Sequence, residues 1–122
     1  MTHKLLLVDD SGLARKRMRA ILEGAGFAVI EAADGMAALE QYFVERPDVV
    51  MLDLVMKGMY GLDVLTKLRE LDPHARVIVV SADVQDSSQQ IAIAGGAIAF
   101  LQKPIEPERI LSAVRTVLEG AV

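Results

Sequence analysis

The sequence predicts a doubly wound α/β fold built on one five-stranded parallel sheet with helices on both faces. Short apolar runs alternate along the chain with segments whose apolar residues recur at helical spacing. Runs that are apolar throughout are typical of strands buried on both faces of a sheet. Helices between such strands require parallel pairing with right-handed crossovers. We adopt the strand order 2-1-3-4-5 from the common order of five-stranded folds of this class.

Five segments are expected to be strands, and they are residues 4–8, 28–31, 48–52, 76–80 and 98–102. Four of them run directly into polar residues that can bind phosphate or a metal ion. These residues are Asp9 and Asp10, Asp53, Ser81, and Lys103. Because ligands bind at the carboxyl ends of the strands in open α/β sheets, we expect these side chains to share one crevice.

Helices are expected over about residues 11–24, from 34 to before Pro47, through 62–71, over 84–94 and over 106–119. Ser11 is a candidate N-cap, and Pro107 falls in a first turn, where its missing N–H costs nothing. Leu13 and Leu71 share the helical spacing of the apolar residues in their helices. Ile93 is expected to be exposed. The inward stripe expected for the fourth helix is Ser88, Ile91, Ala92 and Gly95.

The composition predicts one small domain over residues 1–122 and excludes several classes of function. No stretch approaches the roughly 20 apolar residues of a membrane span. The first strand begins too early to leave room for a signal peptide, and the absence of cysteine argues against disulfides, so the expected location is cytoplasmic. A net charge of −4 and 4% aromatic residues argue against direct binding to nucleic acid or membranes.

The predicted crevice suits phosphoryl transfer. Three carboxylates repel one another unless a cation offsets them, and an all-oxygen site favours Mg²⁺, or Mn²⁺, over zinc. The carboxylate of Asp53 can attack a phosphoryl group and hold it as an acyl phosphate. The metal and Lys103 would offset charge on the transferring oxygens, and Ser81 could donate a hydrogen bond to one of them.

Each of these residues also has an ordinary structural interpretation. Asp9 or Asp10 alone can cap the first helix, because acidic residues are favoured near helix N-termini. Asp53 can cap a turn, Ser81 can be a surface hydroxyl and Lys103 a solvated cation. Their joint placement at neighbouring strand ends favours the functional interpretation. The Lys103–Pro104 bond is also a candidate for the cis form, which occurs in about 5–6% of X–Pro bonds.

Several motifs occur together over the whole chain. They are Asp9-Asp10, Asp53-Leu54, Gly61 eight residues after Asp53, Ser81-Ala82, and Phe100 three residues before Lys103-Pro104. In this combination the chain resembles the CheY-like receiver domains of two-component response regulators, which share the flavodoxin-like strand order.

The resemblance implies a role for each matching residue. Asp53 would be the phosphoacceptor, which a sensor histidine kinase or a phosphotransfer protein phosphorylates. Asp10, Asp53 and the Val55 backbone carbonyl would bind Mg²⁺ directly, with Asp9 acting through a water. Ser81 and Lys103 would hold the phosphoryl oxygens. Ser81 and Phe100 would form the switch.

The switch would change the surface of the fourth helix, fifth strand and fifth helix, and so control a downstream protein target. Such a domain promotes its own phosphorylation and dephosphorylation and is not a turnover enzyme. It would be a monomer or a phosphorylation-linked dimer.

Two departures from the family pattern bear on the surroundings of the site. Lys57 stands where the family often has proline, which predicts a more mobile loop, and Tyr60 replaces a common acidic residue. Val55 and Asp83 flank the site and are expected to tune the access of water to the acyl phosphate.

The sequence argues against two other functions and leaves two further possibilities open. An aspartate-nucleophile phosphatase needs an acid two residues after the nucleophile, where this chain has Val55. A flavodoxin-like redox module needs a hydroxyl-rich phosphate loop after the first strand, where Asp9 and Asp10 would repel the cofactor. The chain could also be the amino-terminal receiver of a longer DNA-binding or enzymatic regulator, or an interaction module that works without phosphorylation.

Overall fold

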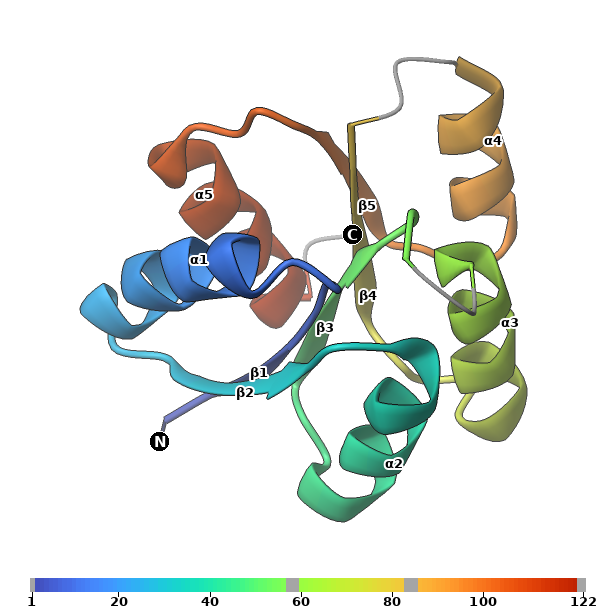
Figure 1. The fold of residues 1–122 in the computed structure, drawn as a ribbon, viewed down its shortest axis with the longest axis horizontal. Coiled ribbons are helices and arrows are strands. Elements are labelled where there is room, and N and C mark those ends of the chain that lie inside the picture. Colours follow the sequence, from blue (N-terminus) through green and yellow to red (C-terminus); the bar gives the residue numbers. More distant parts are fainter. Residues whose placement is uncertain (1, 57–59, 83–85, 121–122) are drawn as a thin grey trace.

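A computed structural model describes residues 2–56, 60–82 and 86–120 of the chain. It contains one parallel sheet in the order β2-β1-β3-β4-β5, which confirms the predicted topology (Figure 1). The strands are β1 (Lys4–Val8), β2 (Ala28–Ala32), β3 (Val49–Asp53), β4 (Val77–Ser81) and β5 (Ala99–Gln102). The predictions made for Lys57, Asp83 and Val84 fall outside the described residues.

The described helices are α1 (Gly12–Gly24), α2 (Gly35–Glu45), α3 (Gly61–Leu71), α4 (Asp86–Ala94) and α5 (Pro107–Leu118). Helices α1 and α5 lie on one face of the sheet, and α2, α3 and α4 lie on the other (Figure 1). The predicted N-cap of α1 is confirmed, because the Ser11 hydroxyl accepts a hydrogen bond from the Ala14 amide at 3.1 Å. Pro107 begins α5, and the Lys103–Pro104 peptide is cis.

The sheet separates two apolar clusters, because successive side chains of a strand point to opposite faces. Leu6 and Val8 belong to the cluster beneath α2, α3 and α4. Leu5 and Leu7 belong to the cluster beneath α1 and α5. Every residue of β3 and β4 is buried, as expected of central strands in a doubly wound sheet. These two strands therefore place their carboxyl ends, Asp53 and Ser81, on a rigid support.

Three apolar residues are more exposed than their spacing predicts. Leu13 is 80% exposed, because Ala14 and Met18 of the same helix turn toward the sheet while Leu13 turns away. Leu71 ends α3 beyond the part of the helix that packs on the core. Ile91 is exposed because its neighbour Ala92 is the α4 residue that meets the core, which corrects the predicted stripe. Ile93 is exposed as predicted.

The first residue of α3 packs directly on the backbone at the end of β3. The Gly61 amide donates to the Leu54 carbonyl at 2.9 Å. A Cβ atom at Gly61 would lie 2.3 Å from the Asp53 carbonyl oxygen and 2.6 Å from the Leu54 Cα. Both neighbours are backbone atoms, so neither can turn aside as a flexible side chain would. Glycine is required here by the close approach of two backbones.

A polar contact joins α2 to the turn after α3. The Tyr42 hydroxyl donates to the Asp72 carboxylate at 2.6 Å, and that carboxylate also accepts from the His74 amide at 3.0 Å. The hydrogen bond from Tyr42 is the main reason that the pKa of Asp72 lies below its usual range. Burial and the same contact raise the pKa of the Tyr42 hydroxyl.

Among the described residues, no helix has the length and apolar content needed to cross a bilayer.

Gly61→Ala is expected to destabilise the fold by about 1–3 kcal/mol, because the new methyl group must push apart the start of α3 and the end of β3. Gly24→Ala is the matched control, because its Cβ would meet nothing within 4 Å. The control is expected to be neutral or to stabilise by up to about 1 kcal/mol. Urea unfolding of the three proteins measures both changes, and equal stabilities for the two variants would contradict the close approach.

Tyr42→Phe is expected to lower the free energy of unfolding by about 1.5 kcal/mol at pH 7, where the hydroxyl donates to a charged and partly exposed carboxylate. Because the pKa of Asp72 is lowered in the folded state, its contribution to the free energy of unfolding is fully present above the ordinary carboxyl pKa of about 3.9. That contribution is lost as the pH falls through the folded pKa. The difference between wild type and variant should therefore narrow in acid.

Urea unfolding at pH 7 and at a pH below the ordinary carboxyl pKa of about 3.9 tests this dependence. Tyr60→Phe removes the same hydroxyl from an exposed tyrosine and serves as the control. A loss of stability in Tyr42→Phe that is the same at both pH values would show that the charge of Asp72 is not involved.

Candidate functional site

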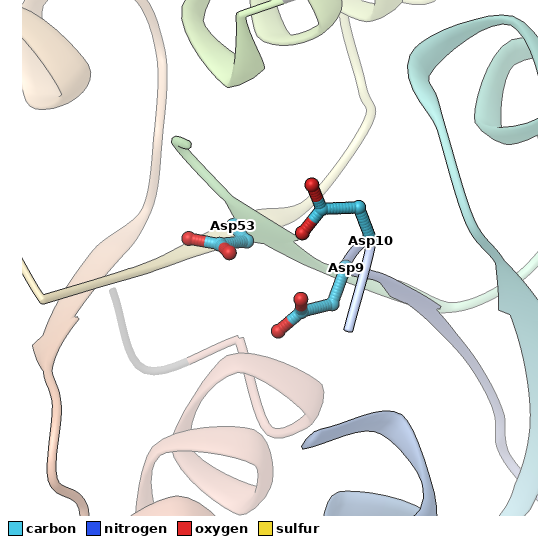
Figure 2. A group of neighbouring side chains, drawn as sticks. All are labelled: Asp9, Asp10 and Asp53. Carbon is cyan, nitrogen blue, oxygen red and sulfur yellow. The ribbon is translucent and has the colours of Figure 1, made fainter. Parts of the chain in front are cut away.

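Three carboxylates gather where the neighbouring strands β1 and β3 end. Asp9 and Asp10 directly follow β1, and Asp53 is the last residue of β3. Figure 2 shows the three side chains lying side by side, and each offers an oxygen within 4.8 Å of the others. The structure thus brings together the three acidic residues that were predicted to share the crevice.

Asp53 is more enclosed than its sequence position predicts. We expected Asp53 to follow the strand, but β3 continues through Asp53, which pairs in register with Val80 of β4. As a result the residue is only 9% exposed. Its Oδ1 atom accepts a hydrogen bond from the Val55 amide at 3.3 Å.

The pKa of Asp53 is raised above the usual range of a carboxyl group. Burial is the main cause, and the negative charges of Asp9 and Asp10 raise it further. The Lys103 ammonium and the Val55 amide act in the opposite direction. Burial and the neighbouring acids therefore disfavour negative charge on Asp53, and additional positive charge would stabilise its carboxylate form.

Lys103 supplies part of that positive charge. Its Nζ atom lies 3.1 Å from Asp9 Oδ2 and 3.6 Å from Asp53 Oδ2, so the ammonium contacts two of the three acids. Its backbone amide donates to the Ser81 carbonyl at 2.8 Å, which anchors the residue after β5 to the end of β4. The predicted placement of Lys103 at the acidic crevice is confirmed.

Ser81 and Phe100 lie on the same face of the sheet. Val79 pairs with Phe100, and Ser81 is two residues beyond Val79 on the same strand, so the side chains of Ser81 and Phe100 project toward the same layer of helices. Ser81 is fully buried. Phe100 is partly buried and packs against the cluster beneath α2, α3 and α4. A switch that couples Ser81 to Phe100 requires both side chains to lie on the same face of the sheet.

The acidic cluster fits a small divalent cation by its chemistry. Carboxylate oxygens are the ligands of hard ions, and the described residues here include no His or Cys beside them. The direct ligand role of Asp10, the water-mediated role of Asp9 and the role of the Val55 carbonyl stay predictions.

One set of residues near the site was not found from the sequence. Arg15 and Arg19 of α1 both contact Glu31 of β2, and Arg15 also reaches the backbone of Asp9. The available signal was an acidic residue inside an otherwise apolar strand, together with two arginines four residues apart on a neighbouring helix. Sequence reasoning placed these arginines outside the apolar stripe of the helix without assigning them a partner.

Comparison with known proteins agrees with this site. Residues 5–115 match the response regulator receiver domain family. The chain is 38% identical over 119 residues to the chemotaxis protein CheY of Bacillus subtilis, covering 97% of this chain and 99% of the relative.

Solved structures agree as well. A CheY-like receiver domain protein from Methanospirillum hungatei has a TM-score of 0.93 at 25% identity, covering 98% of this chain and 96% of the other. CheY in the CheX–CheY–BeF₃–Mg²⁺ complex of Borrelia burgdorferi has a TM-score of 0.90 at 34% identity, covering 94% and 88%. A match of this extent favours neither the phosphatase nor the redox alternative. The chain belongs to the response regulator receiver domain family and is a receiver of two-component signalling.

Proposed function

We propose that Asp53 is the phosphoacceptor of this receiver and that Asp9, Asp10 and Lys103 create the conditions for its reaction. The observation that carries the proposal is a buried carboxylate with an oxygen of each of two further acids within 4.8 Å and an ammonium at 3.6 Å. A purely structural aspartate at this position would not need two additional acids beside it. An aspartate that must accept a phosphoryl group needs cationic charge, and this cluster attracts it.

The chemistry is an in-line displacement at phosphorus. An Asp53 carboxylate oxygen forms a bond to the phosphorus while the bond from phosphorus to the donor's imidazole nitrogen breaks, and the electron pair leaves with that nitrogen. Lys103, which already lies beside Asp53 Oδ2, offsets charge on the phosphoryl oxygens. Ser81 donates a hydrogen bond to one of these oxygens. Hydrolysis of the acyl phosphate later restores the free carboxylate.

Asp9, Asp10, Asp53 and the Val55 carbonyl are proposed to hold Mg²⁺, with Mn²⁺ as a substitute. When bound, the ion supplies positive charge that offsets the phosphoryl oxygens and relieves the repulsion among the acids. The CheY of the Borrelia burgdorferi complex was found with Mg²⁺, BeF₃ and the protein CheX. That complex supports both a metal and a protein partner for this chain.

The donor is proposed to be a histidine kinase or a phosphotransfer protein, and the receiver is proposed to act on a downstream protein. Each phosphorylation consumes one donor and each hydrolysis resets the domain, so no external substrate is turned over.

Incubation with acetyl phosphate and Mg²⁺ tests the phosphoacceptor directly. Intact mass should rise by one phosphoryl group in wild type and should not rise in Asp53→Asn, which keeps the shape of the side chain and lacks its nucleophilic charge. A chelator should abolish the gain. Asp63→Asn changes an exposed aspartate in the first turn of α3 and serves as the control. A gain of mass in Asp53→Asn would show that another residue is phosphorylated.

We further propose that Ser81 and Phe100 transmit the modification to the surface of α4, β5 and α5. A phosphoryl group adds about −1.5 to −2 charges and three acceptor oxygens. Hydrogen bonds to charged groups contribute about 1.5–3 kcal/mol each, so two new bonds from Ser81 and Lys103 approach the about 5.5 kcal/mol that reverses a 1:99 population. Movement of Ser81 toward the phosphoryl group opens space on the face toward which Phe100 projects.

The receiving surface has features that a protein partner can contact. A surface cavity of about 310 Å³ lies between β5 and α5, and Phe100, Arg109 and Thr116 are among its lining residues. Ile91 and Ile93 are exposed on α4, which contacts β5.

NMR of the aromatic side chains tests the switch, because the chain has three phenylalanines and no tryptophan. Addition of Mg²⁺ and beryllium fluoride should shift the Phe100 ring signals and leave those of Phe43, on α2, nearly unchanged. In Ser81→Ala the Phe100 shift should be reduced several-fold while the ligands still bind. A Phe100 signal that is unaffected in wild type would leave this residue with a packing role only.

A further inference from the structure

We propose that Arg15, held in place by Glu31, is a positioning residue that fixes Asp9 for metal binding. The guanidinium of Arg15 donates to the Asp9 backbone carbonyl through Nη1 and to Glu31 Oε1 through Nε at 2.9 Å. One side chain therefore connects the acidic site to the second strand of the sheet. This inference rests on the proposed function, because it assigns a role to Arg15 only if the acids bind a cation.

The topology explains why these residues meet. Glu31 pairs in register with Leu7, whose side chain lies in the cluster beneath α1 and α5, so Glu31 also faces α1. Arg15 and Arg19 are four residues apart and lie on one face of that helix. Arg19 contacts the second Glu31 oxygen through Nη1 and the Val29 carbonyl through Nη2 at 3.2 Å.

Glu31 is thereby bound by two guanidinium groups in a partly enclosed position. The side chains of Arg15 and Glu31 are 18% and 28% exposed, so solvent screens their contact less than it screens a surface ion pair. Arg19 is held further by Glu23 at 3.3 Å. The orientation of the Arg15 guanidinium is therefore determined by the network before any metal is present.

Asp9 is held mainly by polar contacts. Its amide donates to the Ala32 carbonyl at 3.2 Å, its Oδ1 accepts from the Ser11 amide at 2.9 Å, and its Oδ2 accepts from Lys103 at 3.1 Å. The contact from Arg15 to its carbonyl completes the set. The partners come from β2, from α1 with its N-cap and from the residue after β5, so three segments together hold Asp9.

Packing does not replace these contacts. A cavity of about 50 Å³ lies directly against Asp9, with Arg15, Lys103 and Val80 among its lining residues. Because this space is large enough for a water molecule, Asp9 has room to shift if a polar contact is lost. Removing the Arg15 side chain would enlarge the same cavity.

Arg15→Gln separates positioning from simple electrostatics, because the two effects change the Mg²⁺ affinity in opposite directions. Removing a positive charge near an acidic cluster should by itself strengthen Mg²⁺ binding. Loss of positioning should weaken it, by about 10-fold, as is typical when a group that orients a metal ligand is removed. Isothermal titration of the metal-free protein with Mg²⁺, without any phosphodonor, measures this affinity.

Lys16→Gln removes the same charge from the exposed neighbouring position of α1 and serves as the control. It is expected to leave Mg²⁺ affinity unchanged or slightly higher. Glu31→Gln is expected to weaken binding in the same direction as Arg15→Gln, since it releases the guanidinium. Arg15→Lys should not restore the affinity, because a single ammonium cannot reproduce the two directed contacts of the guanidinium.

A second readout needs neither metal nor activity. In the metal-free protein, the backbone amide signals of Asp9 and Ser11 should shift in Arg15→Gln and not in Lys16→Gln. Circular dichroism establishes that each variant is folded. Unchanged or tighter Mg²⁺ binding in folded Arg15→Gln would overturn the positioning role. Failure of the wild type to bind Mg²⁺ would instead overturn the proposed metal site itself.

Discussion

The repulsion among three carboxylates is the constraint around which the rest of this structure is arranged. Asp9, Asp10 and Asp53 offer oxygens within 4.8 Å of one another, and Asp53 is largely buried. Such a cluster opposes folding unless cations and hydrogen-bond donors surround it. Lys103, the Ser11 amide and the Val55 amide all point at these oxygens. The stability that the two apolar clusters provide allows the domain to hold a site that is unfavourable by itself.

Much of the fold could be predicted because its signals are local. The strands are continuous apolar runs, and the N-cap Ser11 and the first-turn Pro107 mark where α1 and α5 begin. The arrival of Lys103 beside Asp9, 94 residues away in sequence, could also be predicted, because parallel strands bring their carboxyl ends to one edge. The strand topology thus places residues from separate sequence motifs in one site.

The features that could not be predicted depend on contacts between elements. Burial of Asp53 follows from its pairing with Val80, and no property of residue 53 alone reveals it. The exposure of Leu13 and Ile91 depends on how each helix is rotated on the sheet, which helical spacing leaves undetermined over about 100°. The contact between Arg15 and Glu31 depends on both the strand register and the rotation of the helix on the sheet. Sequence patterns specify neither.

The two apolar clusters have a consequence for how this domain can change over evolution. Glu31 and Arg15 meet on the face of the sheet covered by α1 and α5, whereas Phe100 and Ser81 project toward the opposite layer. The sheet therefore separates the residues proposed to orient Asp9 from the residues proposed to respond to phosphorylation of Asp53. On this proposal, substitutions on one face would alter how readily the domain is phosphorylated. Substitutions on the other face would alter which proteins recognise the phosphorylated form. A lineage can retune either property while it conserves the other.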